Sequence, residues 1–150
     1  MPQSFARILI HLVFSTKGRY PFLQDRVRVS LHSYMATVLR NFGCPPILIN
    51  SVPDHVHLLI ELARTASVSA VVEEVKTTSS KWIKTQGREY TNFSWQTGYG
   101  AFSVSASNME NVRDYVANQQ EHHRQHSFQE EYRTFMKRSG ISFDEKYGWD

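Results

Sequence analysis

The spacing of apolar residues changes along this chain in a definite order, and that order restricts the possible folds. A two-residue period indicates strands, whereas recurrence every three or four residues indicates helices. Strands are expected at 5–16, 47–52, 55–62 and 99–105, and helices at about 24–42, 68–85, 108–124 and 128–138. The order β-α-β-β-α-β is that of the ferredoxin-like fold. We therefore predict an α+β, RRM-like antiparallel sheet with two helices on one face, an open second face, and two added C-terminal helices.

Polar residues at three predicted helix starts support this assignment. Ser67 is placed to cap the helix that begins at about residue 68. Ser107 with Glu110, and Ser127 with Glu130, have the spacing of a capping box. These pairs predict the starts of the third and fourth helices.

The composition is that of an ordinary folded domain. The chain has 150 residues, 41% of them hydrophobic, and no linker or repeat interrupts it, so residues 1–150 are expected to form one domain. Cys44 is the single cysteine, which excludes an internal disulfide and favours a reducing compartment. The longest apolar stretch, 8–14, is too short to cross a bilayer, and no signal peptide is recognisable. These features predict a cytoplasmic protein.

Two histidines lie at the start of the third predicted strand. Because residues two apart on a strand point to the same side, His55 and His57 should share a face with Leu59 and Glu61. The alternate residues form the better core face, so both imidazoles are expected on the open side of the sheet. Neutral imidazoles that converge there can bind a divalent metal. The spacing alone fits a simpler role better, that of two half-buried histidines at a strand end.

A tyrosine and a glutamine lie one turn apart on the third predicted helix. The four-residue spacing places Tyr115 and Gln119 on the same helix face. Tyr115 also borders an apolar stripe that includes Val112 and Val116, so its ring could simply pack in the core. From the spacing alone, neither function nor packing is excluded.

Taken together, these residues resemble the single-tyrosine HUH transposases, which comprise small insertion-sequence transposases of the IS-two-hundred type and the related palindromic-repeat-associated tyrosine transposases. HUH denotes two histidines around a hydrophobic residue, here His55-Val56-His57 after Pro53-Asp54. The other similar segments are 11–17 (HLVFSTK), 95–104 (WQTGYGAFSV), 115–119 (YVANQ), 121–123 (EHH), Phe128 and the closing Trp149-Asp150. The resemblance covers nearly the whole chain.

The resemblance implies a metal-dependent DNA transposase with Tyr115 as its nucleophile. The metal ligands would be His55, His57 and Gln119, and the cofactor would be Mg²⁺ or Mn²⁺. Imidazole ligands suit Mn²⁺ better than Mg²⁺, while the family is expected to use either. Tyr115 would attack single-stranded DNA at hairpin-bearing element ends and form a 5′-phosphotyrosine intermediate.

The resemblance also implies a homodimer. One tyrosine in each chain makes one covalent link at a time, and excision of an element needs two cuts. The strand at 99–105 carries small side chains such as Ala101 and Ser103 and could join the sheets of two chains at its edge. From the residues alone, that strand could instead be covered by a loop of its own chain.

Contacts with DNA are indicated only by charge and position. The net charge of +3 and the isoelectric point near 9.1 allow nucleic-acid binding but are shared by many proteins without such a partner. The candidate DNA-binding residues are Lys17, Arg19, Lys76, Ser80, Lys81, Lys84, Arg88 and Trp95. The lysines of the second helix are expected on its exposed side, where they could contact phosphates, and Trp95 could stack on a base. A charged helix face is more often only solvated.

Three rival functions stay open. A non-catalytic single-stranded nucleic-acid-binding module would need exposed aromatic rings on the sheet and no metal. A hydrolase that uses metal-bound water would leave Tyr115 with a structural role. A host-adopted enzyme that processes palindromic repeats would have the same chemistry, so that no residue separates it from a mobile transposase.

Overall fold

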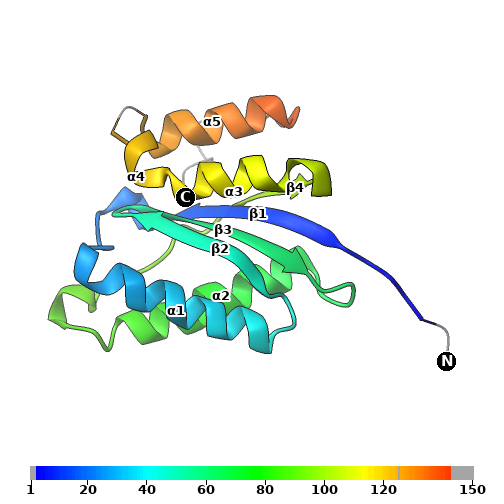
Figure 1. The fold of residues 1–150 in the computed structure, drawn as a ribbon. Coiled ribbons are helices and arrows are strands. Elements are labelled where there is room, and N and C mark those ends of the chain that lie inside the picture. The colour runs from blue at the N-terminus through cyan, green and yellow to red at the C-terminus, as the bar shows by residue number, and fades with distance from the viewer. Residues whose placement is uncertain (1–2, 125, 143–150) are drawn as a thin grey trace.

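The computed structural model describes residues 3–124 and 126–142 and contains a four-stranded antiparallel sheet (Figure 1). The strands are β1 (Ile8–Ser15), β2 (Pro46–Val52), β3 (His55–Leu62) and β4 (Gly100–Val104). The helices are α1 (Asp25–Asn41), α2 (Val68–Ile83), α3 (Met109–Ala117), α4 (Gln119–His122) and α5 (Phe128–Arg138). The strand order is β2-β3-β1-β4, with every neighbouring pair antiparallel. The predicted ferredoxin-like α+β architecture is confirmed.

The main hydrophobic core lies between the sheet and the helices α1 and α2. Apolar residues at helical spacing on α1, such as Leu31 and Met35, are fully buried. They pack with the alternate apolar residues of the central strands, such as Phe14 of β1 and Leu58 of β3. This face is therefore the core face that the strand alternation predicts.

The opposite face of the sheet is covered by α3, α4 and α5 (Figure 1). A second, smaller cluster forms there from Val13 of β1 with Phe128 and Tyr132 of α5. The side chains of His55 and His57 on this face have no exposed surface. The prediction of an open sheet face is therefore wrong, because α5 carries an apolar stripe of its own that packs on the sheet.

The helix expected at about 108–124 is two helices. Asn118 lies between α3 and α4 with φ −99° and ψ 26°, which ends the regular α-helix. Ser67 and Ser127 cap α2 and α5 as predicted, since each accepts a bond from a backbone N–H three residues on. Ser107 caps nothing; it lies in a 3₁₀ turn, η3 (Ala106–Asn108), that leads into α3.

The pair Trp149-Asp150, which resembles the family in sequence, lies outside the described residues. Within the described ranges, no helix combines the length and the apolar character that a membrane crossing requires.

Candidate active site

The two histidines lie at the start of β3, where this strand pairs with β1. His55 pairs in register with Ser15, and His57 pairs with Val13. Because their side chains point away from the main core, they lie beneath α4 and α5, where both are fully buried. The strand geometry thus places both imidazoles side by side, with ring centroids 5.2 Å apart.

Four side chains converge at this point of the sheet. Glu131 of α5 directs its Oε1 atom to within 2.9 Å of His57 Nε2 and 3.3 Å of His55 Nε2. His123, which follows α4, brings its Nε2 to 3.2 Å from the same oxygen and 2.9 Å from His55 Nε2. One donor atom from each of the four residues lies within 4.8 Å of all the others. This spacing is compatible with a divalent metal site.

The second nitrogen of each imidazole is held by another group. Nδ1 of His55 lies 2.7 Å from Asp54 Oδ1, and Nδ1 of His57 lies 2.7 Å from His11 Nε2. Nδ1 of His123 donates to the backbone carbonyl of His126 at 2.6 Å. Such contacts fix the orientation of metal-binding histidines and leave Nε2 for the ion.

Tyr115 reaches the same cluster from α3 within a single chain. Its hydroxyl donates to Glu131 Oε2, and His122 Nε2 lies 3.3 Å from the phenol oxygen. Its ring packs edge-on against His57, with centroids 5.9 Å apart. The structure therefore brings Tyr115 together with the histidines of β3, as the sequence analysis predicts.

Gln119 is fully buried at the start of α4, one turn beyond Tyr115. Its Nε2 donates to the Tyr115 carbonyl at 3.2 Å. Its Oε1 has no hydrogen-bond partner within the described part of the chain. A buried oxygen without a partner is costly, and a nearby cation would satisfy it. Its role as a metal ligand stays a prediction.

The ionisable groups of the site have shifted pKa values. Although burial alone would raise the pKa of the Glu131 carboxyl, its hydrogen bonds with His123, His55 and His57 hold it well below its usual range. Burial lowers the pKa of His57 to about 4. For His55, burial is outweighed by the hydrogen bonds to Asp54 and Glu131, which raise its pKa.

The phenol of Tyr115 has a raised pKa. The largest cause is burial, followed by the charge of Glu131 and the hydrogen bond to it; the hydrogen bond from Gln119 acts in the opposite direction. Tyr115 is therefore a neutral phenol at pH 7. To act as a nucleophile, it needs activation by a base or a metal ion.

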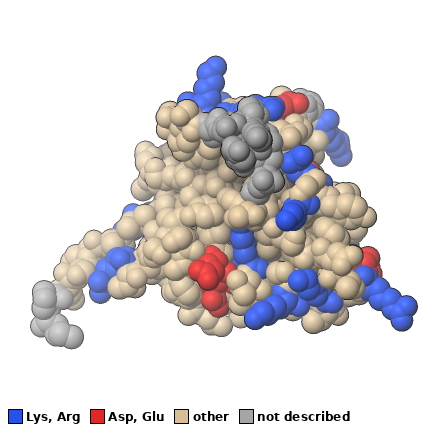
Figure 2. All heavy atoms as spheres, turned by 180° about the vertical axis from the view of Figure 1, so that it is seen from behind, with Lys and Arg blue, Asp and Glu red and all other residues tan. Residues whose placement is uncertain are grey.

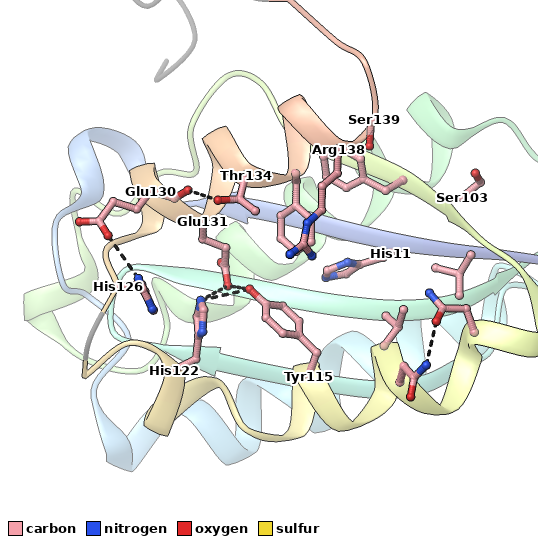
Figure 3. A pocket seen from close by; sticks show the side chains of 16 residues that line it. His11, Ser103, Tyr115, His122, His126, Glu130, Glu131, Thr134, Arg138 and Ser139 are labelled. Atoms are coloured by element: carbon pink, nitrogen blue, oxygen red, sulfur yellow. Dashed lines mark hydrogen bonds and ion pairs between the residues drawn. The ribbon is translucent and has the colours of Figure 1, made fainter.

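A pocket of about 850 Å³ opens beside Tyr115, between α3, α5 and β4 (Figure 3). Its walls include three aromatic rings, those of Tyr115, Phe102 and Phe135, of which the latter two stack with centroids 5.1 Å apart. Arg138 extends into it from α5, and Glu131 lies at its inner end (Figure 3). The pocket thus combines a cation, flat apolar surfaces and the candidate nucleophile.

The candidate DNA-binding residues are divided by the structure. The side chains of Lys17, Lys81, Lys84 and Arg88 are exposed, and those of Arg19 and Ser80 are half-buried. Figure 2 shows basic side chains spread over one face of the molecule, with few acidic ones among them. Their contacts with DNA stay a prediction.

Two of the candidates have structural roles instead. Lys76 is half-buried, and its Nζ donates to the carbonyls of Gln96 at 2.8 Å and Gly98 at 2.6 Å. Trp95 is buried, and its indole N–H donates to Ser79 Oγ at 3.0 Å. The expected exposure of Lys76 is therefore wrong, and the burial of Trp95 contradicts its prediction as a base-stacking residue; a contact of Lys76 with DNA stays a prediction. Both residues tie the segment before β4 to α2.

Sequence reasoning missed three residues of the site. His11 supports His57, and His123 and Glu131 contribute donor atoms. His123 belongs to the segment 121–123 that resembles the family, but the resemblance did not assign it a role. Glu131 was visible only as one acidic residue near the start of a helix, a position that acidic residues favour for electrostatic reasons alone.

Comparisons with known proteins point to one family. A family model described as "Transposase IS200 like" matches residues 4–119. A crystal structure of a candidate transposase from Deinococcus radiodurans is similar at a TM-score of 0.63 and 21% identity, over 79% of this chain and 98% of that one. A REP-associated tyrosine transposase bound to a REP hairpin is similar at a TM-score of 0.61 and 14% identity, over 82% of this chain and 73% of that one. The comparison with curated proteins gives no match.

Proposed function

Because the chain belongs to the IS200-like transposase family, we propose that it cuts and rejoins single-stranded DNA through a covalent 5′-phosphotyrosine at Tyr115. The observation that carries this proposal is the contact of the Tyr115 phenol with the cluster of His55, His57 and Glu131. A tyrosine with only a packing role has no need of a buried carboxylate and imidazoles at its hydroxyl.

The cluster fits a divalent metal, Mg²⁺ or Mn²⁺. His55 and His57 of β3 turn their Nε2 atoms to a common point, and the buried Oε1 of Gln119, at the start of α4, has no hydrogen-bond partner among the described residues. His55 and His57 would hold the ion, with Gln119 as the third ligand that the family resemblance implies. When bound, it would withdraw charge from a phosphate and stabilise the negative transition state.

The chemistry of the protein side chains balances without a further cofactor. The Tyr115 oxygen forms a bond to phosphorus while the bond from phosphorus to the 3′-oxygen breaks. The phenol loses its proton as this bond forms, and the departing 3′-oxygen takes up a proton, so the step is balanced; the hydrogen bond to Glu131 Oε2 orients the phenol. Attack by a free 3′-hydroxyl on the phosphotyrosine reverses these bond changes and reseals the strand.

Unpaired DNA is the substrate that the pocket favours. Rings such as Phe102 and Phe135 can stack on a base, and Arg138 can meet a phosphate. The solved relative bound to a REP hairpin supports recognition of folded single strands at the ends of an element. A host-adopted processing enzyme for palindromic repeats would use the same site.

We also propose that the chain acts as a homodimer in the cytoplasm. β4 lies at one edge of the sheet, and in the described part of the chain it pairs only with β1. Its other edge is available to the same strand of a second copy. Measurement of the molar mass in solution tests this point.

The deciding experiment is incubation of the protein with end-labelled hairpin DNA and Mn²⁺, followed by a denaturing gel. We expect a protein–DNA adduct that is absent in Tyr115→Phe. His57→Ala should lose cleavage but keep hairpin binding. Tyr99→Phe, at a tyrosine that packs against the main core, is the matched control and should keep the adduct.

Other outcomes would point to the rival functions. Full cleavage by Tyr115→Phe without an adduct would indicate a hydrolase that uses metal-bound water. Hairpin binding with no cleavage under any metal would indicate a non-catalytic binding module.

A further inference from the structure

We infer that Glu131 and His123 are metal ligands together with His55 and His57, and that this four-donor site selects a transition-metal ion such as Mn²⁺ over Mg²⁺. This inference deepens the proposed function and rests on it, because both concern the same site. Both added residues lie beyond the segment that the family model matches, which ends at residue 119.

The orientation of the imidazoles carries the first step. The Nδ1–H of His123 donates to the His126 carbonyl, and the Nδ1 of His55 faces the Asp54 carboxylate, which can only accept. In the neutral rings, both Nε2 atoms therefore present lone pairs. These lone pairs face each other across 2.9 Å.

The carboxylate adds a further acceptor at the same point. Glu131 Oε1 lies 3.3 Å from His55 Nε2 and 3.2 Å from His123 Nε2. Acceptors this close repel one another unless a positive charge lies among them. A metal ion satisfies all of these atoms at once, whereas one proton joins only two.

Burial strengthens the argument. The side chains of His55 and His57 have no exposed surface, Glu131 is 2% exposed and His123 is 9% exposed. Water therefore cannot separate the acceptors. Buried charged groups in proteins are paired or coordinate metals, and a carboxylate with three imidazoles around one oxygen has the composition of a metal site.

The donor types indicate the class of ion. Mg²⁺ prefers oxygen ligands and keeps several waters, while imidazole suits transition metals. Three nitrogen donors and one carboxylate oxygen favour the second class. The expected set of His55, His57 and Gln119 has two nitrogens and a neutral oxygen, so the two ligand sets predict different affinities.

Glu131 also connects the ion to the nucleophile. Its Oε1 faces the imidazoles, while its Oε2 accepts the hydrogen bond from Tyr115. The same carboxylate therefore positions the phenol with respect to the metal site. In this respect Glu131 is a positioning residue for Tyr115.

The test measures metal affinity directly, without DNA. The full-length protein, freed of metal by chelation and dialysis, is titrated with Mn²⁺ and separately with Mg²⁺ by calorimetry, and thermal unfolding shows that each variant is folded. We expect Mn²⁺ to bind at least about tenfold more tightly than Mg²⁺. Glu131→Gln and His123→Ala should each weaken Mn²⁺ binding by about tenfold or more.

A matched control and a rival variant make the result decisive. Glu130→Gln removes the exposed neighbouring carboxylate, which faces His126, and should leave Mn²⁺ affinity within about twofold. Unchanged Mn²⁺ affinity in Glu131→Gln, with a loss in Gln119→Ala, would overturn the inference while leaving the proposed function intact. Unchanged affinity in His57→Ala as well would remove the metal from the proposed function itself.

Discussion

The hydroxyl of Tyr115 donates a hydrogen bond to the carboxylate of Glu131, although 16 residues separate them in the chain. The two side chains come from different helices, α3 and α5, which both cover the histidine face of the sheet. The two bonded groups have different neighbours: the phenol of Tyr115 borders the pocket, and the carboxylate of Glu131 faces the imidazoles. Glu131 therefore joins the candidate nucleophile to the candidate metal site.

Tyr115→Phe should separate chemistry from metal binding. The variant loses the attacking oxygen, so we expect adduct formation to fall by about 10³-fold or more. Mn²⁺ affinity should fall less than in Glu131→Gln, because the phenol hydrogen-bonds to a candidate ligand but supplies no donor atom itself. The two measurements are a denaturing gel and a calorimetric titration. A large loss of Mn²⁺ affinity would show that the phenol itself is a ligand.

His32 should make the fold sensitive to acid. Burial, with a smaller effect of Arg28, lowers its pKa from 6.5 to about 4, and its Nε2 lies 2.7 Å from Ser51 Oγ. The unfolded chain therefore binds a proton between pH 6.5 and 4 that the folded chain does not. The free energy of unfolding should decrease as the pH falls through this range, by about 1–2 kcal/mol from this group, because partial exposure reduces the full effect.

The measurement is urea unfolding of wild type and His32→Gln at a series of pH values. The variant should lose that part of the pH dependence, while His11 and His57 contribute equally to both proteins. Identical slopes in the two proteins would show that His32 titrates normally in the folded chain.

Lys76→Met should destabilise the segment before β4. The substitution keeps much of the side chain's length but removes the bonds to the carbonyls of Gln96 and Gly98, which we expect to cost about 1–3 kcal/mol. Lys84→Met, at an exposed lysine near the end of the same helix, should change stability by no more than about 0.5 kcal/mol. Equal effects in chemical unfolding would contradict the structural role of Lys76.

Gly100→Ala should overpack the junction between β4 and α5. A Cβ atom at this position would lie 2.7 Å from Tyr132, 2.9 Å from Phe102 and 3.0 Å from Val13. We expect a loss of about 1–3 kcal/mol in thermal or urea unfolding. Ser103→Ala, at an exposed position of the same strand, should be nearly neutral. Wild-type stability of Gly100→Ala would mean that α5 moves aside easily.

Exposed lysines of α2 should show their role in the salt dependence of hairpin binding. If Lys81 and Lys84 contact phosphates, each change to Gln should reduce the slope of log affinity against log salt by about one. The control Glu73→Gln, at an exposed acidic residue of the same helix, should not reduce the slope. Unchanged slopes for both lysines would move the DNA-binding surface to another face.

Much of the fold follows from the spacing of apolar residues. Alternation along β1 and β3, and the stripe of Leu31 and Met35 on α1, identify the elements and their shared core. The strand order then follows from the sequence of elements, since few topologies accommodate it. Local capping was less certain, because Ser107 has the right spacing but lies in a 3₁₀ turn.

The covered second face was not predictable from periodicity. Phe128 and Tyr132 identify an apolar side of α5, but spacing does not say which surface that side meets. Trp95 was misplaced for a related reason. It lies in a polar segment, and only the three-dimensional structure shows the bond from its indole to Ser79.

The candidate site was predicted in part. His55, His57 and Tyr115 were chosen by their resemblance to a family, and the structure brings them together. No sequence pattern distinguishes Glu131, because an acidic residue in the first turn of a helix normally stabilises the helix and faces solvent. Its burial depends on the fold of α5 over the sheet, which no local pattern contains.

If DNA is cut at the proposed site, the cover that α3–α5 form over the histidine face restricts the shape of a strand that can enter. The imidazoles have no exposed surface, and the scissile phosphate would approach through the pocket between these helices, past the ring of Tyr115. A strand without a complement can bend its backbone to bring one phosphate past these helices, whereas a double helix is stiff. The architecture itself would thus reject paired DNA before any base is recognised.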